Sequence, residues 1–271
     1  MDKQERGIFA ALKRLLELPE TADLPLDDPQ TTCIRKSIVQ RKGFLRRLYT
    51  EWYGICRNVA RRAPTGLQIE IGAGPGFLRQ VTPNVIASDL MTIDGVQLVC
   101  SGEALPFAAG TVAALYLVDV LHHMPRPRAF FSEAARCLVP GGRLLMIEPH
   151  NTAWGRWVWR NLHHEPFDPD GAWEPEPAGP LSGGNSAMPW IVFHRDRTLF
   201  ERTFPELRIA ALEPFMPFSY LLSGGVSLRS LAPGIAYPVC RACERLLRPF
   251  NGALAMFCII EIERGPAVKQ P

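Results

Sequence analysis

The chain has 271 residues, of which 47% are hydrophobic and 21% are charged. These are ordinary values for a globular protein, and they exclude a collagen-like, low-complexity or coiled-coil chain. The length suits one large domain, or one domain with a sizeable extension. Because the net charge is only +3, the overall balance requires no polyanionic partner, and we expect no nucleic acid partner.

Seven cysteines lie along the chain without the spacing of a disulfide framework, which predicts free thiols in a reducing compartment. Cys240 and Cys243 form the only C-x-x-C pair. Since no second pair or pair of histidines lies near them, we interpret them as neighbours on a helix and expect no metal. No secretory signal or transmembrane run is evident, so we expect a cytoplasmic protein of undetermined oligomeric state.

Residues 1–65 have a helical pattern and are interpreted as an N-terminal helical extension, interrupted by a loop over 19–29. Nine basic residues and one acidic residue, Glu51, lie between positions 35 and 62. Most of the basic residues lie off the apolar stripe. A solvated face explains them, and peripheral contact with an anionic membrane through the basic helix 35–62 is an alternative.

From residue 66 the pattern is that of strands joined by crossovers, with strands expected at 67–71, 85–88, 96–100, 112–118 and 143–148. Helices are expected at 76–81 and 128–138, the second ended by Pro140-Gly141-Gly142. Two later strands, 207–212 and 254–262, would complete the sheet edge. The segments 150–200 and 213–250 would then be insertions near the carboxyl ends of the strands, where ligands bind in such folds.

The segment from Leu67 to Phe77 reads as a strand that runs into a glycine loop, with glycines at 72, 74 and 76. A dinucleotide fingerprint places its third glycine one residue later. Glu70 puts a carboxylate beside the loop, which suits a cation better than a pyrophosphate. Asp89 follows the second strand, where an acidic residue can accept hydrogen bonds from both hydroxyls of a ribose. The pattern therefore indicates a ligand with a ribose and a positive group.

These segments resemble the class I S-adenosylmethionine-dependent methyltransferases of the small-molecule type, including those of ubiquinone and menaquinone biosynthesis. The resemblance covers residues 66–149 and is carried by Glu70–Gly76, Ser88-Asp89-Leu90, Gly102–Phe107, Asp119–His123 and Leu138–Leu144. It implies an α/β fold, a Rossmann-like doubly wound, mostly parallel seven-stranded sheet with an N-terminal helical extension and a substrate-covering insertion. The methyltransferase domain would span residues 66–271.

The resemblance implies S-adenosyl-L-methionine as the cofactor, with the methionine part at Glu70, the ribose at Asp89 and the adenine near Ser101. In full, the cofactor-binding residues that it implies are Glu70, Gly72, Ala73, Gly74, Gly76, Asp89, Leu90, Ser101, Gly102, Glu103, Asp119 and Val120. Similarly placed N-terminal helices cover the cofactor in this family, so Tyr49, Trp52 and Tyr53 are expected in that cover.

All six histidines lie between 122 and 194, on the side where the acceptor is expected. Candidates for a general base are His123, His150 and His163, although His123 could simply shape the cofactor pocket. Candidates for acceptor binding are Trp154, His164, Asn185 and Trp190. Residues 163–168 could be read as metal ligands, but adjacent side chains point apart, and 183–190 could be a self-packed loop.

The predicted function is methyl transfer from S-adenosylmethionine to an O, N or C nucleophile of a small, partly apolar metabolite. An aromatic, proline-rich segment after residue 150 favours a flat or apolar acceptor. Two alternatives are an NAD(P)-linked oxidoreductase, which the glycine spacing disfavours, and a non-catalytic scaffold or sensor of the same fold. Ser101 and Ala113, which depart from the family's pattern, favour the scaffold, whereas the intact glycine loop and Asp89 argue against it.

Overall fold

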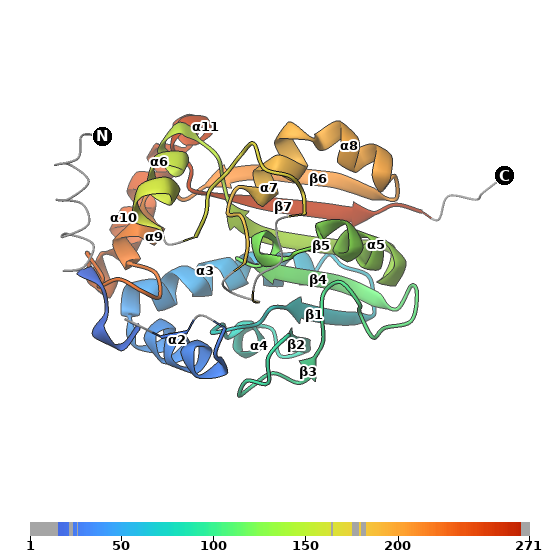
Figure 1. Cartoon of the computed structure of the whole chain (residues 1–271), viewed down its shortest axis with the longest axis horizontal. Helices are drawn as coiled ribbons and strands as arrows, with labels where there is room; N and C mark the ends of the chain where they lie inside the picture. Colours follow the sequence, from blue (N-terminus) through green and yellow to red (C-terminus); the bar gives the residue numbers. More distant parts are fainter. Residues whose placement is uncertain are drawn as a thin grey trace.

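The computed structural model describes residues 16–21, 24, 25, 27–163, 165–174, 179 and 183–266. Its centre is a seven-stranded sheet in the order β3-β2-β1-β4-β5-β7-β6 (Figure 1). Strands β1 to β5 run parallel, and β7 lies antiparallel between β5 and β6. The strands are β1 (Leu67–Ile71), β2 (Val85–Asp89), β3 (Leu98–Val99), β4 (Val112–Val118), β5 (Leu138–Pro149), β6 (Leu207–Phe215) and β7 (Phe257–Arg264). This order confirms the predicted Rossmann-like doubly wound sheet.

In the sequence, most of the helices precede β1 or follow β5. In chain order they are η1 (Pro19–Thr21), α2 (Pro29–Arg41), α3 (Gly43–Ala60), α4 (Leu78–Val81), η2 (Leu121–His123), α5 (Pro127–Cys137), α6 (Ala153–Leu162), α7 (Met188–Trp190), the π-helix η3 (Ile191–Arg195), α8 (Arg197–Thr203), α9 (Ser219–Ser223), η4 (Gly234–Ala236), α10 (Tyr237–Leu246), η5 (Arg248–Phe250) and α11 (Asn251–Leu254). None of these combines the length and apolar character of a membrane span.

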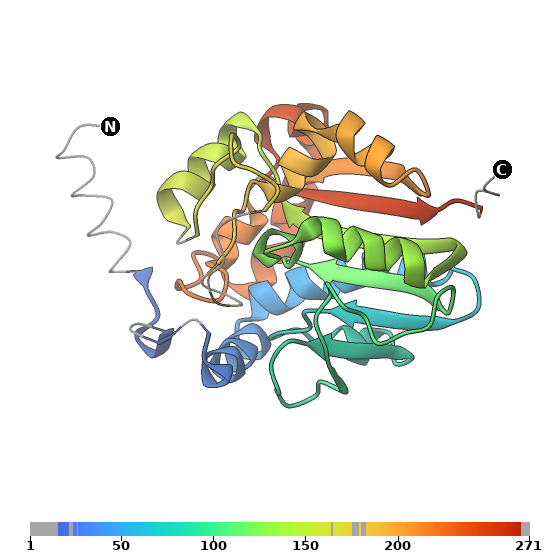
Figure 2. The same cartoon turned by 45° about the vertical axis from the view of Figure 1, so that its right-hand side comes forward.

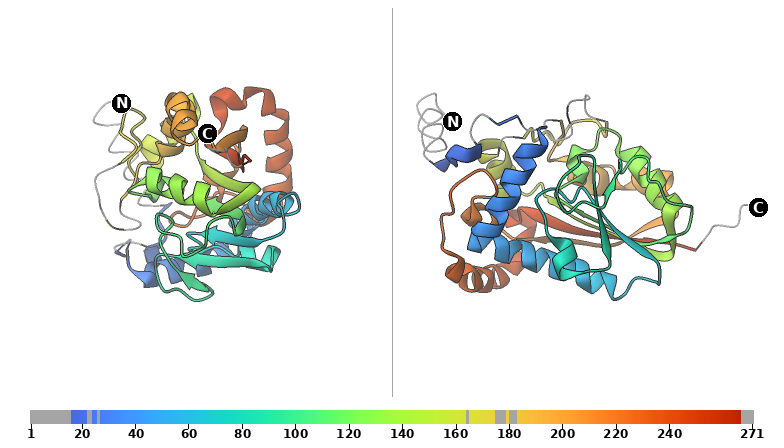
Figure 3. Two further views of the ribbon diagram at one scale, coloured as in Figure 1. Left: turned by 90° about the vertical axis from the view of Figure 1, so that its right-hand side faces the viewer. Right: turned by 90° about the horizontal axis from the view of Figure 1, so that it is seen from below.

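Helices cover both faces of the sheet. On one side, Trp52 of α3 packs against Phe257 of β7, with ring centroids 5.0 Å apart. On the other side, Phe131 of α5 meets Phe193 and Phe200 at 5.7 and 5.1 Å. The left view of Figure 3 shows α5 on one side and α3 with α10 on the other. Burial of aromatic rings on both faces is a main source of stability for such a layered core.

Strand β4 is central, and all but its last residue are buried, as expected for a parallel strand covered on both faces. Its hydrogen-bonded neighbours are β1 and β5. The parallel strands therefore end together at one edge of the sheet. Helices α2, α6 and α9 gather near that edge (Figures 1 and 2). Helices α6 and α9 belong to the segments 150–200 and 213–250, and the assignment of these segments as insertions on the acceptor side stays a prediction.

Strand β5 differs most from the prediction. It begins at Leu138, directly after α5, and includes the Pro140-Gly141-Gly142 segment that we expected as a turn. Leu138 pairs with Val112 and Arg143 pairs with Ala114, so the intervening residues form an irregular bulge. Gly141 has a φ of 77°, a conformation that glycine adopts at low cost. The two strands that we expected at the edge, 207–212 and 254–262, are present as β6 and β7 with shifted ends.

Three other elements also differ from the expected ranges. Helix α4 begins only at Leu78, because Gly76 and Phe77 belong to the turn after the glycine loop, and β3 keeps two residues of the range 96–100. Residues 153–162 form the regular helix α6 where an irregular loop was expected. The expected helix before residue 16 lies outside the described residues.

Candidate functional site

The glycine loop leaves β1 in a conformation that favours glycine. Gly72 and Gly74 have φ angles of 66° and 44°. The amide of Ala73 donates to the Ser88 carbonyl at 2.8 Å, which ties the loop to the end of β2. A Cβ atom on Gly72 would lie 2.8 Å from the Val120 side chain. The loop backbone therefore stays open to a ligand only because these positions carry no side chain.

Two acids flank the loop, and they have different environments. The Asp89 carboxylate accepts hydrogen bonds from the amides of Gly74 and Met91, at 2.9 and 3.0 Å. Glu70 is 3% exposed, and no described residue donates a hydrogen bond to its carboxyl group. Burial, with the Asp89 charge as a second cause, raises the pKa of Glu70 to about 8. Glu70 is thus a buried acid for which the described part of the chain provides no paired counter-charge.

Both acids line one cavity of about 520 Å³, here called the glycine-loop cavity. Every cofactor-binding residue predicted from the resemblance lies on its wall. Tyr49 and Tyr53 of α3 line it too, and the Tyr53 hydroxyl accepts a hydrogen bond from the Phe77 amide at 3.1 Å. Trp52 instead packs beneath the sheet against Phe257. Two of the three expected cover residues therefore reach the cavity.

The loop after β4 is held by an acid that sequence reasoning missed. Glu148 is fully buried, and its Oε1 accepts hydrogen bonds from the amides of Val120 and Leu121 at 2.9 and 2.8 Å. These bonds fix the loop in which Asp119 has a φ of 63°, a rare angle for a non-glycine residue. Burial raises the pKa of Asp119 to about 7. A carboxylate directly after the apolar run of residues 144–147 was the one sequence signal for Glu148.

His122 lies between two carboxylates. Its Nδ1 is 2.7 Å from Glu148 and its Nε2 is 3.1 Å from Glu165. Burial alone lowers the pKa of His122. The hydrogen bonds to the two carboxylates outweigh burial and raise this pKa well above its usual value. Burial and the neighbouring His122 lower the pKa of His123, whose Nδ1 lies 3.0 Å from the Gly183 carbonyl. His122 is therefore protonated and His123 neutral near pH 7.

A second cavity of about 360 Å³, here called the apolar cavity, adjoins the first. Helices α6 and α9 provide much of its wall, through Val158, Trp159, Leu162 and Leu221. Four residues line both cavities: Arg35, His163, Tyr220 and Val226. The two spaces therefore meet at a junction that carries a guanidinium, an imidazole and a phenol.

Sequence reasoning placed Arg35 on a solvated face. In the structure it points into the junction, and its Nε is buried without a hydrogen bond to any described residue. The hydroxyl of Thr32, one turn earlier on α2, is likewise buried and unpaired within the described ranges. Arg35 is half-buried, and a buried polar atom without a partner is costly, which marks this position as one that a ligand can complete.

The predicted acceptor and base residues divide between the cavities and the rest of the fold. His123 lines the glycine-loop cavity and His163 lines both cavities. His150 lines neither, because its ring turns toward His194 on the other side of β5. His164 lies outside the described residues.

Three other predicted acceptor contacts, Trp154, Asn185 and Trp190, line neither cavity. The Trp154 indole donates to the Pro217 carbonyl at 2.7 Å, and the Asn185 amide binds Asp168. Trp159, which is 2% exposed and packs on Phe257, lines the apolar cavity instead.

The charge and the hydrogen-bond acceptors of the residues that line the glycine-loop cavity suit S-adenosylmethionine. A nucleotide cofactor with a pyrophosphate would bring negative charge to Glu70, whereas a sulfonium and an ammonium group would neutralise it. Asp89 offers oxygen acceptors to hydroxyl groups at the tip of the next strand. The cavity volume lies within the range of small-molecule sites.

Comparisons with known proteins agree. Residues 69–146 match the model of a methyltransferase domain family. A chain from the complex of the Haloferax volcanii Trm112 methyltransferase activator and a protein described as a methyltransferase has a TM-score of 0.51 at 13% identity, covering 91% of this chain and 100% of that one. Geranyl diphosphate C-methyltransferase from Streptomyces coelicolor A3(2) has a TM-score of 0.46 at 15% identity, and the match covers 85% of this chain and 83% of that chain.

No protein of curated function matches the chain by sequence. The family match covers the glycine loop, both strands that carry the acids, and the strands on either side of Asp119. Residues 69–146 therefore match a methyltransferase domain family, and the chain is similar in fold to S-adenosylmethionine-dependent methyltransferases of class I.

Proposed function

We propose that the protein transfers the methyl group of S-adenosylmethionine to an O, N or C nucleophile of a small, partly apolar metabolite that carries an acidic group. The single observation behind this proposal is the pair of adjoining cavities, one walled by the glycine loop and two acids, the other by apolar residues and Arg35. The cofactor would supply an activated methyl group. The acceptor would occupy the apolar cavity, with its acidic group at Arg35.

The residues then have distinct tasks. Glu70 holds positive charge, Asp89 binds the ribose, and Ser101 to Glu103 flank the base. Methyl transfer is an in-line displacement, so positioning and exclusion of water do most of the work. Tyr49 and Tyr53 from the N-terminal extension, residues 1–65, would close the cavity. Because they lie at the cavity or the junction, His123 and His163 are the proposed proton acceptors for an O or N nucleophile.

Cofactor affinity should depend on pH through Glu70. With a pKa of about 8 the carboxyl group is mostly protonated at pH 6.5, and a cation must displace that proton. We therefore expect affinity for S-adenosylmethionine to rise by up to about tenfold per pH unit from pH 6 to 8, since one proton is released. Calorimetric titration at several pH values measures this. Glu70→Gln should bind more weakly at pH 8 and with a flat profile, and an equally steep profile in that variant would exclude Glu70.

The same group has an opposite effect on folding. Its ordinary pKa is 4.5 and its folded value is about 8, so the folded state binds more protons between these limits. The free protein should consequently lose stability as pH rises from 4.5 to 8. Glu70→Gln should reduce this slope in denaturant titrations.

The acceptor proposal is tested by incubating the enzyme with labelled cofactor and a metabolite extract and identifying the methylated product by mass. We expect an apolar product that bears a carboxylate or phosphate. Arg35→Met should reduce its formation by about 10- to 100-fold, mainly through KM, because a charged hydrogen bond of about 1.5–3 kcal/mol is lost. Arg46→Met, on the exposed face of α3, is the matched control.

Two results would contradict the acceptor proposal. If the product were neutral and formed equally well in Arg35→Met and Arg46→Met, the acceptor would not be one that carries an acidic group. Cofactor binding with no methylated product in any extract would favour the scaffold or sensor instead. Cytoplasmic location and peripheral membrane contact through the basic residues of 35–62 stay predictions.

A further inference from the structure

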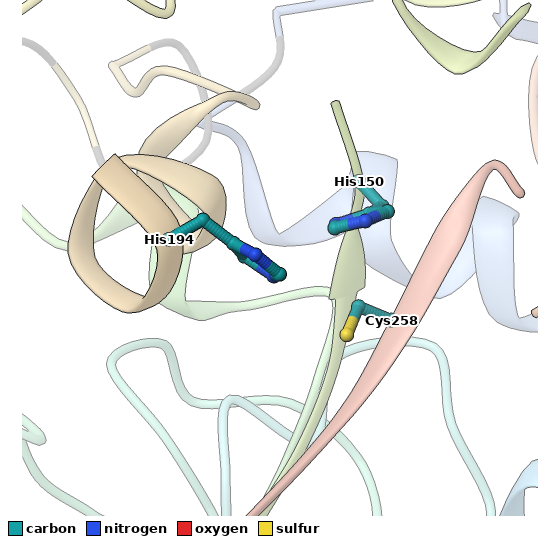
Figure 4. A group of neighbouring side chains, drawn as sticks. All are labelled: His150, His194 and Cys258. Carbon is teal, nitrogen blue, oxygen red and sulfur yellow. The ribbon is translucent and has the colours of Figure 1, made fainter. Parts of the chain in front are cut away.

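Three potential metal ligands meet away from both cavities. They are His150, directly after β5, His194 in the π-helix η3, and Cys258 in β7, and their ligand atoms all lie within 4.8 Å of one another. Figure 4 shows the two rings and the thiol pointing toward a common space. The ring centroids of the histidines are 4.8 Å apart. Residues from three separate segments of the chain thus converge on one point.

The two imidazoles have no other partner in the described chain. None of its hydrogen bonds uses a ring nitrogen of His150 or His194, although His150 is only 6% exposed. Buried polar groups are normally hydrogen-bonded, so an unpaired ring aimed at a second ring and a thiol calls for an explanation. The His122 clusters differ, because their members already bond one another, as His122 does to Glu148 at 2.7 Å.

The two imidazoles are in the protonation state that suits a cation bound through nitrogen, whereas the thiol would have to lose its proton. Burial and the nearby His194 lower the pKa of His150 to about 3, so its ring is neutral and offers a lone pair. Burial also lowers the pKa of His194, with Arg197 as a second cause. Burial raises the pKa of the Cys258 thiol to about 12, so metal binding would replace the thiol proton and release it to solvent.

We propose that His150, His194 and Cys258 bind a divalent transition-metal ion of the zinc class. Two imidazole nitrogens and one thiolate are zinc ligands, whereas magnesium and calcium require oxygens that this cluster lacks. Ligand atoms around a tetrahedral zinc ion lie about 3.5 Å apart, which small side-chain rotations here would provide. His194 is exposed, so the ion can enter and a water molecule can complete the coordination.

Binding at this position would connect η3 to the paired ends of β5 and β7. The His150 amide already donates to the Met256 carbonyl at 2.8 Å, next to β7. The π-helical turn that carries His194 is a rare conformation, found mostly at functional positions. Thr152 begins α6 two residues after His150, and α6 lines the apolar cavity. The ion would therefore stabilise the segment that carries the acceptor wall.

The test is a Co²⁺ titration of the metal-free full chain, followed by absorbance. We expect one equivalent to bind, with a near-ultraviolet band from the thiolate and visible bands of tetrahedral cobalt, and Zn²⁺ to remove both. His194→Gln, at an exposed position, should weaken binding by at least about tenfold. Cys258→Ser should abolish the near-ultraviolet band. Cys243→Ser, at an exposed cysteine elsewhere, is the control and should bind as the wild type does.

Thermal unfolding adds a readout that does not depend on activity. Zn²⁺ should raise the Tm of the wild type and of Cys243→Ser but not that of His194→Gln. If Cys258→Ser does not fold, the comparison of His194→Gln with Cys243→Ser still shows whether the ion binds at this cluster. Equal cobalt affinity in these two variants, or a wild-type spectrum without the thiolate band, would overturn the proposal.

Discussion

Replacing Asp89 by alanine should lower the affinity for S-adenosylmethionine by about 100-fold or more. The carboxylate accepts hydrogen bonds from Gly74 and Met91, so its loss frees the glycine loop. It would also remove the proposed acceptor for the ribose hydroxyls. Hydrogen bonds to charged groups contribute about 1.5–3 kcal/mol each, and 1.4 kcal/mol corresponds to tenfold in affinity. Calorimetric titration with the cofactor measures the effect directly.

Asp94→Ala is the matched control, because that acid is exposed and lies outside the glycine-loop cavity. It should bind the cofactor as the wild type does. Asp89→Asn keeps one oxygen acceptor and should fall between the two. If Asp89→Ala and Asp94→Ala bound equally well, the ribose would not be recognised at the tip of β2.

Replacing Gly76 by alanine should destabilise the fold and weaken cofactor binding together. A Cβ at this position would lie 2.2 Å from the Tyr53 hydroxyl and 2.9 Å from the Ala73 carbonyl oxygen. Tyr53 is buried and its hydroxyl already accepts the Phe77 amide, so neither neighbour can move freely. Overpacking of this kind costs about 1–3 kcal/mol. Denaturant unfolding and cofactor titration on the same sample measure both effects.

Gly54→Ala supplies the contrast. Gly54 lies inside α3, and a Cβ there meets nothing within 4 Å. Because alanine has the higher helix propensity, this variant should be more stable by up to about 1 kcal/mol and should bind the cofactor normally. A Gly76→Ala protein as stable as Gly54→Ala, with unchanged affinity, would show that Tyr53 does not enclose the loop.

The residues that line the glycine-loop cavity were predictable from sequence because they lie at strand ends. Strands 67–71 and 112–118 were predicted with their observed bounds, since each is a short apolar run with a clear end. In a parallel sheet these ends meet at one edge, so Glu70, Asp89 and Asp119 had to converge. All three line the glycine-loop cavity.

The acceptor side was less predictable because it depends on how helices pack. The charge pattern of α2 suggested a solvated face, and only its position against both cavities brings Arg35 to the junction. His150 follows a strand at the correct edge, but its side chain turns to the other face of the sheet, toward His194. On α6 the helix rotation buries Trp159 at the apolar cavity and leaves Trp154 outside it. None of these orientations follows from residue spacing alone.

The central claim is that the space between Glu70 and Asp89 holds the cofactor. The most direct test is a crystal structure of the protein with S-adenosylhomocysteine. We predict the ribose hydroxyls within hydrogen-bond distance of the Asp89 carboxylate, the amino group near Glu70, and the sulfur facing the junction at Arg35 and His163. A ligand bound elsewhere, or with its sugar away from Asp89, would contradict the assignment.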